Sequence, residues 1–335
     1  MTDVGTAAYV ADPAPEATEA AEAIERLEDN IELVIQGKRD VVRMAIVCLL
    51  AEGHLLIEDV PGLGKTSLAR SLCRSVDGKL GRIQFTPDLL PSDVVGSVVY
   101  NQADNDFEFH RGAVFANLVI ADEINRATPK TQSALLEVME ELRVTSEGKP
   151  YDVPRPFMVV ATQNPIDHDG TYPLPEAQLD RFLMRIKVGY PDEAAEVRVL
   201  QGEQRRVSPD SLSPVLTLPE LERLIAYAHG IHVDTQLHSY AVRLAAATRD
   251  HDDVRLGASP RGSLALVRAG RAFAAAEGRP FVTPDDVKRV APSVLAHRVL
   301  LKQEAVIRRR GQLDIVTELL DRVPVPTVNA AGLGR

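Results

Sequence analysis

The chain has 335 residues, of which 45% are hydrophobic and 26% charged, a composition typical of a globular protein of about two domains. Its two cysteines, Cys48 and Cys73, are too few for a disulfide framework and fit a reducing compartment, so we expect a cytoplasmic protein. The sequence contains no apolar run long enough to span a membrane. Its N-terminus lacks the basic start and apolar core of a secretory signal.

The charge balance is acidic, with 38 Lys and Arg against 48 Asp and Glu and a net charge of −10. Proteins that bind nucleic acid broadly neutralise its phosphates with Lys and Arg, so this balance argues against nucleic acid as a partner. Aromatic residues make up only 4% and tryptophan is absent, which also argues against a stacking surface for single strands.

The first half of the chain alternates apolar runs with helical patterns. Residues 1–20 are rich in Ala, Pro, Thr and Glu and predict a disordered tail, and a helix is expected from Glu22. Helical stretches such as Lys65–Ser75 and Lys130–Leu142 then separate five strand-like segments, three of which are nearly continuous apolar runs. These segments predict the strands of a parallel sheet with helices on both faces: His54–Glu58, Arg82–Thr86, Leu118–Ala121, Phe157–Thr162 and Met184–Val188. We therefore expect an α/β domain over residues 21–192.

The second half of the chain carries helix-start signals instead of strands. Thr217 and Glu220 have the spacing of a capping box, and Ser259–Pro260 and Thr283–Pro284 each place a cap residue before a proline. These signals predict a helical domain over residues 193–335. Inside the α/β domain, turn-rich residues between short strand-like runs predict hairpin insertions near 95–112 and 142–156.

The strongest functional signal is HLLIEDVPGLGKTS, in which a strand runs into a glycine-containing loop and then a helix. Gly62 and Gly64 permit a tight turn that presents backbone N–H groups to phosphate at a helix N-terminus. Lys65 is suited to contact the β- and γ-phosphates, and the Thr66 hydroxyl to join a Mg²⁺ shell. Asp59 stands where the longer form of this pattern has its first glycine, so the loop has the shorter PGxGKT form.

Two carboxylates, Asp122 and Glu123, follow the apolar strand in NLVIADEINRA. Burying carboxylates at a strand end costs free energy unless a cation or a reaction needs them. Asp122 is the candidate partner of Mg²⁺, and Glu123 is the candidate group that polarises an attacking water. The alternative is an ion pair with Arg126 at a helix start.

Three further residues are candidates for phosphoryl-transfer chemistry. Asn164 ends the strand in FMVVATQNP, where it can reach the γ-phosphate or the water, and the alternative is a turn-forming asparagine before Pro165. Arg181 in LPEAQLDRF and Arg261 in GASPRGS are candidates to stabilise charge on the transferred group. Each arginine is also open to the alternative of an ordinary surface residue.

In this order, these segments resemble the MoxR family of AAA+ ATPases. The resemblance extends over about residues 22–327 and also includes LVIQGKRDVV, RIQFTPDLLPSDVVGS and YPLPEAQLDRFLMRI. It implies an α/β AAA+ P-loop core with a parallel five-stranded sheet and a C-terminal all-helical lid domain. It also implies that the two hairpins project toward the central pore of a ring, and the alternative is two exposed hairpins.

The resemblance assigns nucleotide-binding roles by position. Ile35, Gln36 and Gly37 match the segment that cradles adenine. The Walker A loop corresponds to Pro61, Gly62, Leu63, Gly64, Lys65, Thr66 and Ser67. Thr66 and the Walker B residue Asp122 are the implied Mg²⁺ ligands.

The resemblance also assigns catalytic roles, to Lys65 of the loop and to four other residues. Glu123 matches the catalytic Walker B glutamate and Asn164 matches sensor 1. Arg181 matches the finger that acts on the ATP of the neighbouring subunit. Arg261 matches the sensor 2 arginine, which is expected to act on the nucleotide of its own subunit.

By resemblance, the chain is an ATPase that uses ATP and Mg²⁺ and works as a homo-oligomeric ring, expected to be a hexamer. It is expected to remodel or mature client protein complexes, including by insertion of a metal or cofactor. Partners with a von Willebrand A domain are typical of the family. Two alternatives stay open, namely a nucleic-acid-linked AAA+ motor or regulator and the motor subunit of a metal chelatase.

Overall fold

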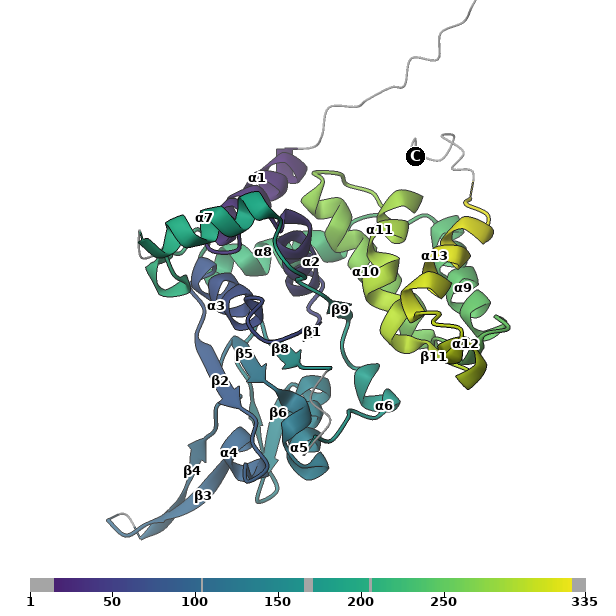
Figure 1. Cartoon of the computed structure of the whole chain (residues 1–335). Helices are drawn as coiled ribbons and strands as arrows, with labels where there is room; N and C mark the ends of the chain where they lie inside the picture. The colour runs from purple at the N-terminus through teal and green to yellow at the C-terminus, as the bar shows by residue number, and fades with distance from the viewer. Residues whose placement is uncertain (1–14, 104, 166–170, 205–206, 327–335) are drawn as a thin grey trace, which may run out of the picture.

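A computed structural model of the chain describes residues 15–103, 105–165, 171–204 and 207–326 (Figure 1). Its centre is a five-stranded parallel sheet with the strand order β2-β5-β8-β1-β9. The strands are β1 (Leu55–Glu58), β2 (Leu80–Gln84), β5 (Leu118–Asp122), β8 (Met158–Gln163) and β9 (Met184–Ile186). Each strand end lies within two residues of its predicted position, and the expected parallel five-stranded sheet is confirmed.

Helices cover both faces of the sheet, because side chains alternate between the two faces along each strand. In β5, Leu118 and Ile120 belong to one buried cluster, whereas Val119 and Ala121 belong to another. The first cluster includes apolar residues of two helices and the second includes those of a third: α2 (Arg39–Leu50), α3 (Lys65–Ser75) and α5 (Pro129–Glu141). The continuous apolar run LVIA is therefore the composition that a strand covered on both sides requires.

The first described helix, α1 (Pro15–Glu32), begins inside the predicted tail. Ala17 and Ala20 are buried, and Ala17 and Ala21 lie beside Gly278, just beyond the end of a long helix of the second half. The prediction of a tail is therefore wrong for residues 15–20, and residues 1–14 lie outside the described part of the chain. The tail prediction rested on the lack of large apolar residues, but alanines can bury a helix face by close packing.

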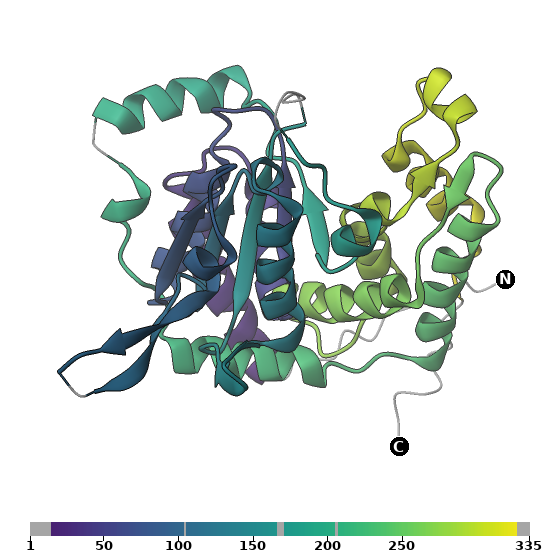
Figure 2. The same ribbon diagram turned by 90° about the horizontal axis from the view of Figure 1, so that it is seen from below.

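Both predicted hairpins are present, and one of them projects from the body of the molecule. The short helix α4 (Pro91–Val95) leads into β3 (Gly96–Asn101) and β4 (Asp106–Arg111), which pair antiparallel. Figures 1 and 2 show this hairpin extending away from the sheet. The second hairpin, β6 (Arg143–Ser146) and β7 (Lys149–Asp152), follows α5. A role of either hairpin at a pore stays a prediction.

After β9 the chain first stays on the α/β core and then forms a separate helical layer. The segment of α7 (Glu193–Gln204), η2 (Pro209–Ser211) and α8 (Leu218–Gly230) contacts the core, where Val215 N–H donates to the carbonyl of Ser75 (2.9 Å). The helices that follow form the lid (Figure 1): α9 (Thr235–Arg249), α10 (Pro260–Ala276), α11 (Pro284–Leu295), α12 (Gln303–Ile307) and α13 (Gln312–Arg322). A domain boundary at residue 193 therefore stays a prediction.

The lid also contains a two-stranded antiparallel ribbon that sequence patterns missed. β10 (Val254–Leu256) pairs with β11 (Leu300–Leu301), which follows the short helix η3 (Ala296–Arg298). Strands of two or three residues are too short to show an alternating pattern, and they form because neighbouring loops satisfy each other's backbone groups. The cap predictions were better, since Thr217, Ser259 and Thr283 each cap a helix with their side chains. Among the described residues, no helix is long and apolar enough to cross a membrane.

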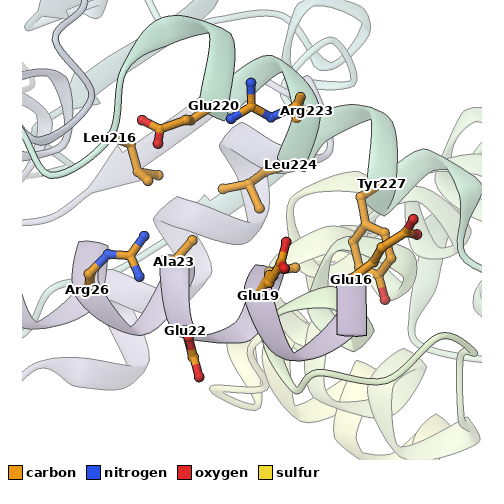
Figure 3. A pocket seen from close by; sticks show the side chains of 11 residues that line it. Glu16, Glu19, Glu22, Ala23, Arg26, Leu216, Glu220, Arg223, Leu224 and Tyr227 are labelled. Atoms are coloured by element: carbon orange, nitrogen blue, oxygen red, sulfur yellow. The ribbon is translucent and has the colours of Figure 1, made fainter. Parts of the chain in front are cut away.

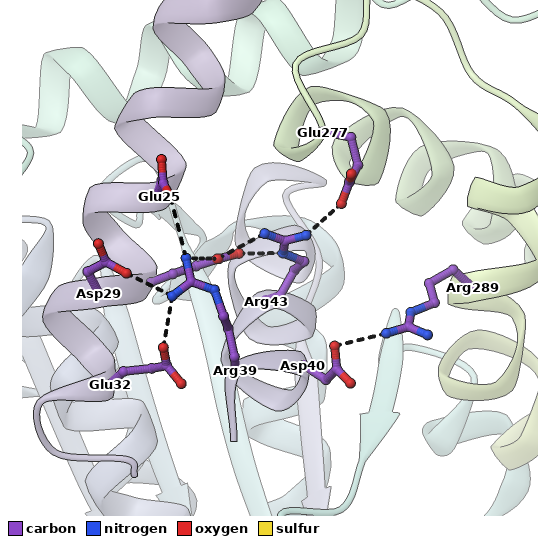
Figure 4. Close-up of polar contacts among 9 residues, drawn as sticks. Glu25, Asp29, Glu32, Arg39, Asp40, Arg43, Glu277 and Arg289 are labelled. Carbon is purple, nitrogen blue, oxygen red and sulfur yellow. Dashed lines mark hydrogen bonds and ion pairs between the residues drawn. The ribbon is translucent and has the colours of Figure 1, made fainter. Parts of the chain in front are cut away.

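An ionic network joins α1 to α2 and α2 to the lid (Figure 4). Its centre is the carboxylate of Glu28, which is fully buried and binds Arg43 through two bonds (Nε 2.6 Å, Nη2 3.0 Å) and Arg39 through a third (3.0 Å). Arg43 also pairs with Glu277 beyond α10 (2.5 Å), and Arg289 of α11 pairs with Asp40 of α2 (2.8 Å). Hydrogen bonds to Glu28 raise the pKa of the Arg43 guanidinium above its usual range.

We expect Glu28→Ala to lower the free energy of unfolding by about 2–3 kcal/mol, because it leaves two guanidinium groups without the buried carboxylate that they share. Urea unfolding followed by circular dichroism measures this change. Glu25→Ala is the matched control on the same helix, because Glu25 is exposed and lies 4.0 Å from Arg39, so its loss is expected to matter by less than about 0.5 kcal/mol. Equal effects of the two substitutions would contradict a structural role for Glu28.

Candidate functional site

The phosphate loop lies at the carboxyl edge of the sheet, between the end of β1 at Glu58 and the start of α3 at Lys65. Gly62 and Gly64 have φ values of +86° and +79°, a region in which a Cβ atom is strained. The loop leads directly into α3, so the N-terminus of this helix lies at the carboxyl edge of the sheet. This is the backbone arrangement that binds phosphate.

Lys65 and Asp59 hold the loop in shape. The Lys65 ammonium donates to the carbonyl oxygens of Asp59 and Val60, the latter at 3.1 Å. The Asp59 carboxylate accepts from the N–H of Val60 (2.9 Å) and from the N–H of Gly189 beyond β9 (2.7 Å). The aspartate that replaces the usual first glycine therefore ties the loop to the segment that follows the edge strand.

Two predicted Mg²⁺ ligands meet beside the loop. Thr66 Oγ1 donates to Asp122 Oδ1 at 2.9 Å, and Asp122 is only 4% exposed. The other carboxylate oxygen accepts from Arg82 Nε of the edge strand β2 (3.0 Å). An aspartate and a hydroxyl are oxygen donors of the kind that Mg²⁺ prefers, so the pair fits that ion. No group of three or more His, Cys, Asp or Glu side chains suited to a metal occurs in the described ranges.

Glu123 lies next to Asp122 but in a different environment. Its backbone is left-handed (φ +56°), and its N–H donates to Thr162 Oγ1 of β8 (2.9 Å). Its carboxylate binds Arg126 Nη1 (2.9 Å) and Gln84 Nε2 (3.3 Å). The alternative ion pair with Arg126 is thus present for Glu123, at the same sheet edge as the phosphate loop.

Asn164 also reaches this edge, because it follows β8, which lies between β5 and β1 in the sheet. The residue is 5% exposed, and its carbonyl oxygen accepts from Asn125 Nδ2 at 3.4 Å. The strand order therefore brings together the phosphate loop after β1, the acidic pair at the end of β5 and the amide after β8.

A cavity of about 460 Å³ adjoins the phosphate loop and has the size of a nucleoside site. Its lining includes most of the residues predicted to bind nucleotide, namely Ile35, Gln36, Gly62, Leu63, Gly64 and Ser67. Pro61, Gly37, Lys65, Thr66 and Asp122 are not part of that lining, although four of them directly neighbour lining residues in sequence.

The opposite wall of this cavity comes from segments that the sequence analysis missed. Val188, Gly189 and Pro191 follow β9, and Arg198 and Val199 lie on α7. Arg198 Nε donates to Gln36 Oε1 at 3.2 Å, which joins this wall to the predicted adenine segment. One signal was available, since the sequence of α7 places Val197, Val199 and Leu200 close together, and all three are exposed in the structure.

Arg181 and Arg261 lie at the amino ends of the sheet strands, opposite the carboxyl ends that the phosphate loop follows. Both bind Glu140 near the end of α5, Arg181 at 2.9 Å and Arg261 at 2.5 Å. The carbonyl of Met139, next to Glu140, contacts His54 Nε2 (3.0 Å), and His54 is the residue that precedes β1. The phosphate loop follows β1, so the length of this strand, about 13 Å at ~3.3 Å per residue, separates the arginines from it.

The position of Arg261 bears on one expectation, which stays a prediction. Arg261 was expected to act on the nucleotide of its own subunit, but it shares a cavity of about 350 Å³ with Arg181 and not the cavity at the phosphate loop. The reason is the placement of the lid, in which α10 begins beside the amino edge of the sheet and carries Arg261 in its first turn.

Another cavity, about 610 Å³, is a groove between α1 and α8 (Figure 3). Carboxylates and two arginines line it, among them Glu16, Glu19, Glu22, Glu220, Arg26 and Arg223. It has no lining residue in common with the cavity at the phosphate loop, and none of the predicted site residues lines it. The candidate active site is therefore the cavity at the phosphate loop.

The strand order, the phosphate loop after β1 and the acidic pair after β5 define an AAA+ P-loop core. Comparison with known proteins agrees, because residues 54–184 match the ATPase family associated with various cellular activities (AAA) and residues 246–319 match the AAA lid domain.

Relatives make the class more specific. The chain is 45% identical over 303 residues to the uncharacterized protein YeaC of Bacillus subtilis, which covers 90% of this chain and 95% of that protein. It is 42% identical over 316 residues to the chaperone MoxR1 of Mycobacterium tuberculosis, with 92% and 83% covered. A crystal structure of an inferred ATPase from Cytophaga hutchinsonii matches with a TM-score of 0.86 at 34% identity, covering 93% of this chain and 97% of that one. The chain belongs to the MoxR family of AAA+ ATPases.

Proposed function

We propose that this chain hydrolyses ATP in a ring of identical subunits, in which each active site is completed by the neighbouring subunit. The observation that carries the proposal is the separation of Arg181 and Arg261 from the phosphate loop of their own chain by the length of β1. Phosphoryl transfer depends on cationic groups that stabilise charge on the transferred group. A second copy of the chain, docked with its arginine face against the loop, supplies these groups.

The remaining chemistry belongs to residues at the carboxyl edge of the sheet. Lys65 binds the β- and γ-phosphates together with the N–H groups of the loop, and Thr66 and Asp122 hold Mg²⁺. The bound ion supplies charge neutralisation at the phosphate oxygens. Glu123 polarises the attacking water after it leaves Arg126, and Asn164 orients the water or the γ-phosphate.

The nucleoside part of ATP occupies the cavity beside the loop. Ile35, Gln36 and Gly37 form one wall, and α7 with the segment after β9 forms the other. In this proposal Arg198 and Gln36 are the polar groups that meet the base or the ribose, because their side chains already bind each other there. Nucleotide binding thereby couples the core to α7, the first helix after the sheet.

The role of the ATPase in the cell is proposed from its relatives. A protein named chaperone MoxR1 is among them, which supports a chaperone role. Remodelling or maturation of client complexes, including metal or cofactor insertion, and a place in the cytoplasm are proposed from the family resemblance and the composition. A hexamer and a partner with a von Willebrand A domain rest on family resemblance alone. The acidic charge balance continues to disfavour a nucleic-acid-linked motor.

Mixing two inactive variants tests the shared site. Arg181→Ala is expected to retain ATP binding and to lose at least about 100-fold in turnover, because an arginine that acts on the γ-phosphate contributes mainly to the transition state. Glu123→Gln is expected to be inactive for a different reason. Steady-state phosphate release should recover when the two are mixed, because a ring then pairs an intact Glu123 with an intact Arg181 of the neighbour.

The control is Arg255→Ala, which removes an exposed arginine paired with Glu176 at 3.7 Å and should keep normal turnover alone. If Arg181→Ala and Glu123→Gln are shown by native mass spectrometry to co-assemble and their mixture stays inactive, the proposal of action between subunits is wrong.

A further inference from the structure

Arg181 and Arg261 share one carboxylate. Glu140 Oε2 lies 2.9 Å from Arg181 Nη2, and Glu140 Oε1 lies 2.5 Å from Arg261 Nη2. We call these three side chains the arginine clasp. Its members come from three distant segments, the last turn of α5, the chain before β9 and the first turn of α10. The clasp is therefore a tertiary arrangement that joins the core to the lid.

The segments that carry the two arginines are also joined to each other by a side-chain hydrogen bond. Ser259 Oγ, two residues before Arg261, donates to Asp180 Oδ2 at 2.9 Å, and Asp180 directly precedes Arg181. Arg298 of the lid donates to Asp180 Oδ1 (2.7 Å) and to the carbonyl of Phe182 (2.7 Å), on both sides of Arg181. The two arginines thus have anchored main chains, and only their long side chains need to be oriented.

The charged side chains around Glu140 indicate what its carboxylate does. Three more arginines line the same cavity of about 350 Å³, namely Arg155, Arg268 and Arg298, whereas Glu52 and Asp180 are its other acidic residues. Guanidinium groups that converge in so small a space repel one another unless an anion lies between them. The hydrogen bond from Arg261 and the charge of Arg181 lower the pKa of Glu140 below its usual range, so the carboxylate stays ionised.

We propose that Glu140 is a positioning residue, which holds Arg181 and Arg261 side by side so that both reach the γ-phosphate of the neighbouring subunit together. One carboxylate with an arginine on each oxygen has nearly the shape of two oxygens of a phosphoryl group with the same partners. The clasp therefore presents the pair in the geometry that phosphate requires before the neighbour's nucleotide arrives. This inference rests on the proposed function.

Glu140→Gln is expected to reduce kcat about tenfold, the factor for losing two exposed ion pairs, and to leave KM for ATP unchanged. ATP affinity should not change because the phosphate loop of the same subunit determines it. The matched control is Glu141→Gln, the next residue of α5, whose exposed carboxylate lies 3.5 Å from Arg143 and outside the clasp. It should retain normal kcat, and both variants should unfold at the same temperature.

A mixture distinguishes positioning from damage to the variant's own site. Glu140→Gln subunits mixed with an excess of Glu123→Gln subunits should regain turnover per Glu140→Gln subunit, because their neighbours then supply an intact clasp. Turnover that stays low in co-assembled mixtures, or a normal kcat of Glu140→Gln alone, overturns the inference. Arg181→Ala and Arg261→Ala are measured in parallel, and normal turnover of both contradicts the proposed function instead.

Discussion

Glu123→Gln is expected to bind ATP with wild-type affinity and to hydrolyse it at least about 100-fold more slowly. The amide keeps the shape of the side chain and its place at the carboxyl edge of the sheet, but it cannot take a proton from water. General-base groups contribute about 10²–10⁴-fold to rate, which sets the expected loss. Isothermal titration calorimetry measures binding, and phosphate release in single-turnover conditions measures hydrolysis.

The contacts of Glu123 and a matched control variant define this experiment. The Glu123 carboxylate binds Arg126 and Gln84, so it must exchange these partners to polarise a water. Glu137→Gln on α5 is the control, because it removes an exposed carboxylate from the same helix that carries Glu140. Glu137 lines neither the cavity at the phosphate loop nor the cavity of Arg181 and Arg261. Turnover near the wild-type rate in Glu123→Gln would exclude the proposed catalytic role and leave the ion pair with Arg126 as its function.

Lys65→Ala is expected to weaken ATP binding by at least about 100-fold. The substitution removes the cation from the loop and also the bonds from its ammonium to the carbonyls of Asp59 and Val60. A hydrogen bond to a charged group contributes about 1.5–3 kcal/mol, and each 1.4 kcal/mol is tenfold in affinity. Calorimetry with Mg-ATP gives the affinity directly.

Lys130→Ala serves as the matched control for Lys65→Ala, since Lys130 is an exposed lysine in the first turn of α5. It should bind ATP normally. Thermal unfolding with and without Mg-ATP provides a second measurement, in which ATP should raise the melting temperature of Lys130→Ala but not of Lys65→Ala. Tight ATP binding by Lys65→Ala would be incompatible with the proposed phosphate site.

The local features of this protein were readable from neighbouring residues. Apolar runs mark β1, β5 and β8 because these strands are buried on both faces of the sheet, and the loop from Pro61 to Ser67 is recognisable by two glycines before a lysine. Thr217 and Thr283 cap their helices as predicted because a cap bond involves residues only three apart. Such interactions join residues that lie close together in the sequence.

Contacts between distant segments were not readable in this way. The β10–β11 ribbon, the α7 wall of the cavity and the burial of Ala17 each depend on a surface that another part of the chain provides. Asp59 looked like a departure from a pattern, and its reason lies 130 residues away at Gly189.

The proposed phosphate-binding and acidic residues follow from the order along the chain, because glycine, lysine and carboxylate chemistry at strand ends points to one reaction. The order along the chain does not determine which subunit each arginine acts on. Arg181 and Arg261 have the same chemistry as any arginine, and their reach depends on where the lid lies against the sheet. Folding puts β1 between them and their own phosphate loop, and distance along a strand is a property of the packed molecule, not of the residue order.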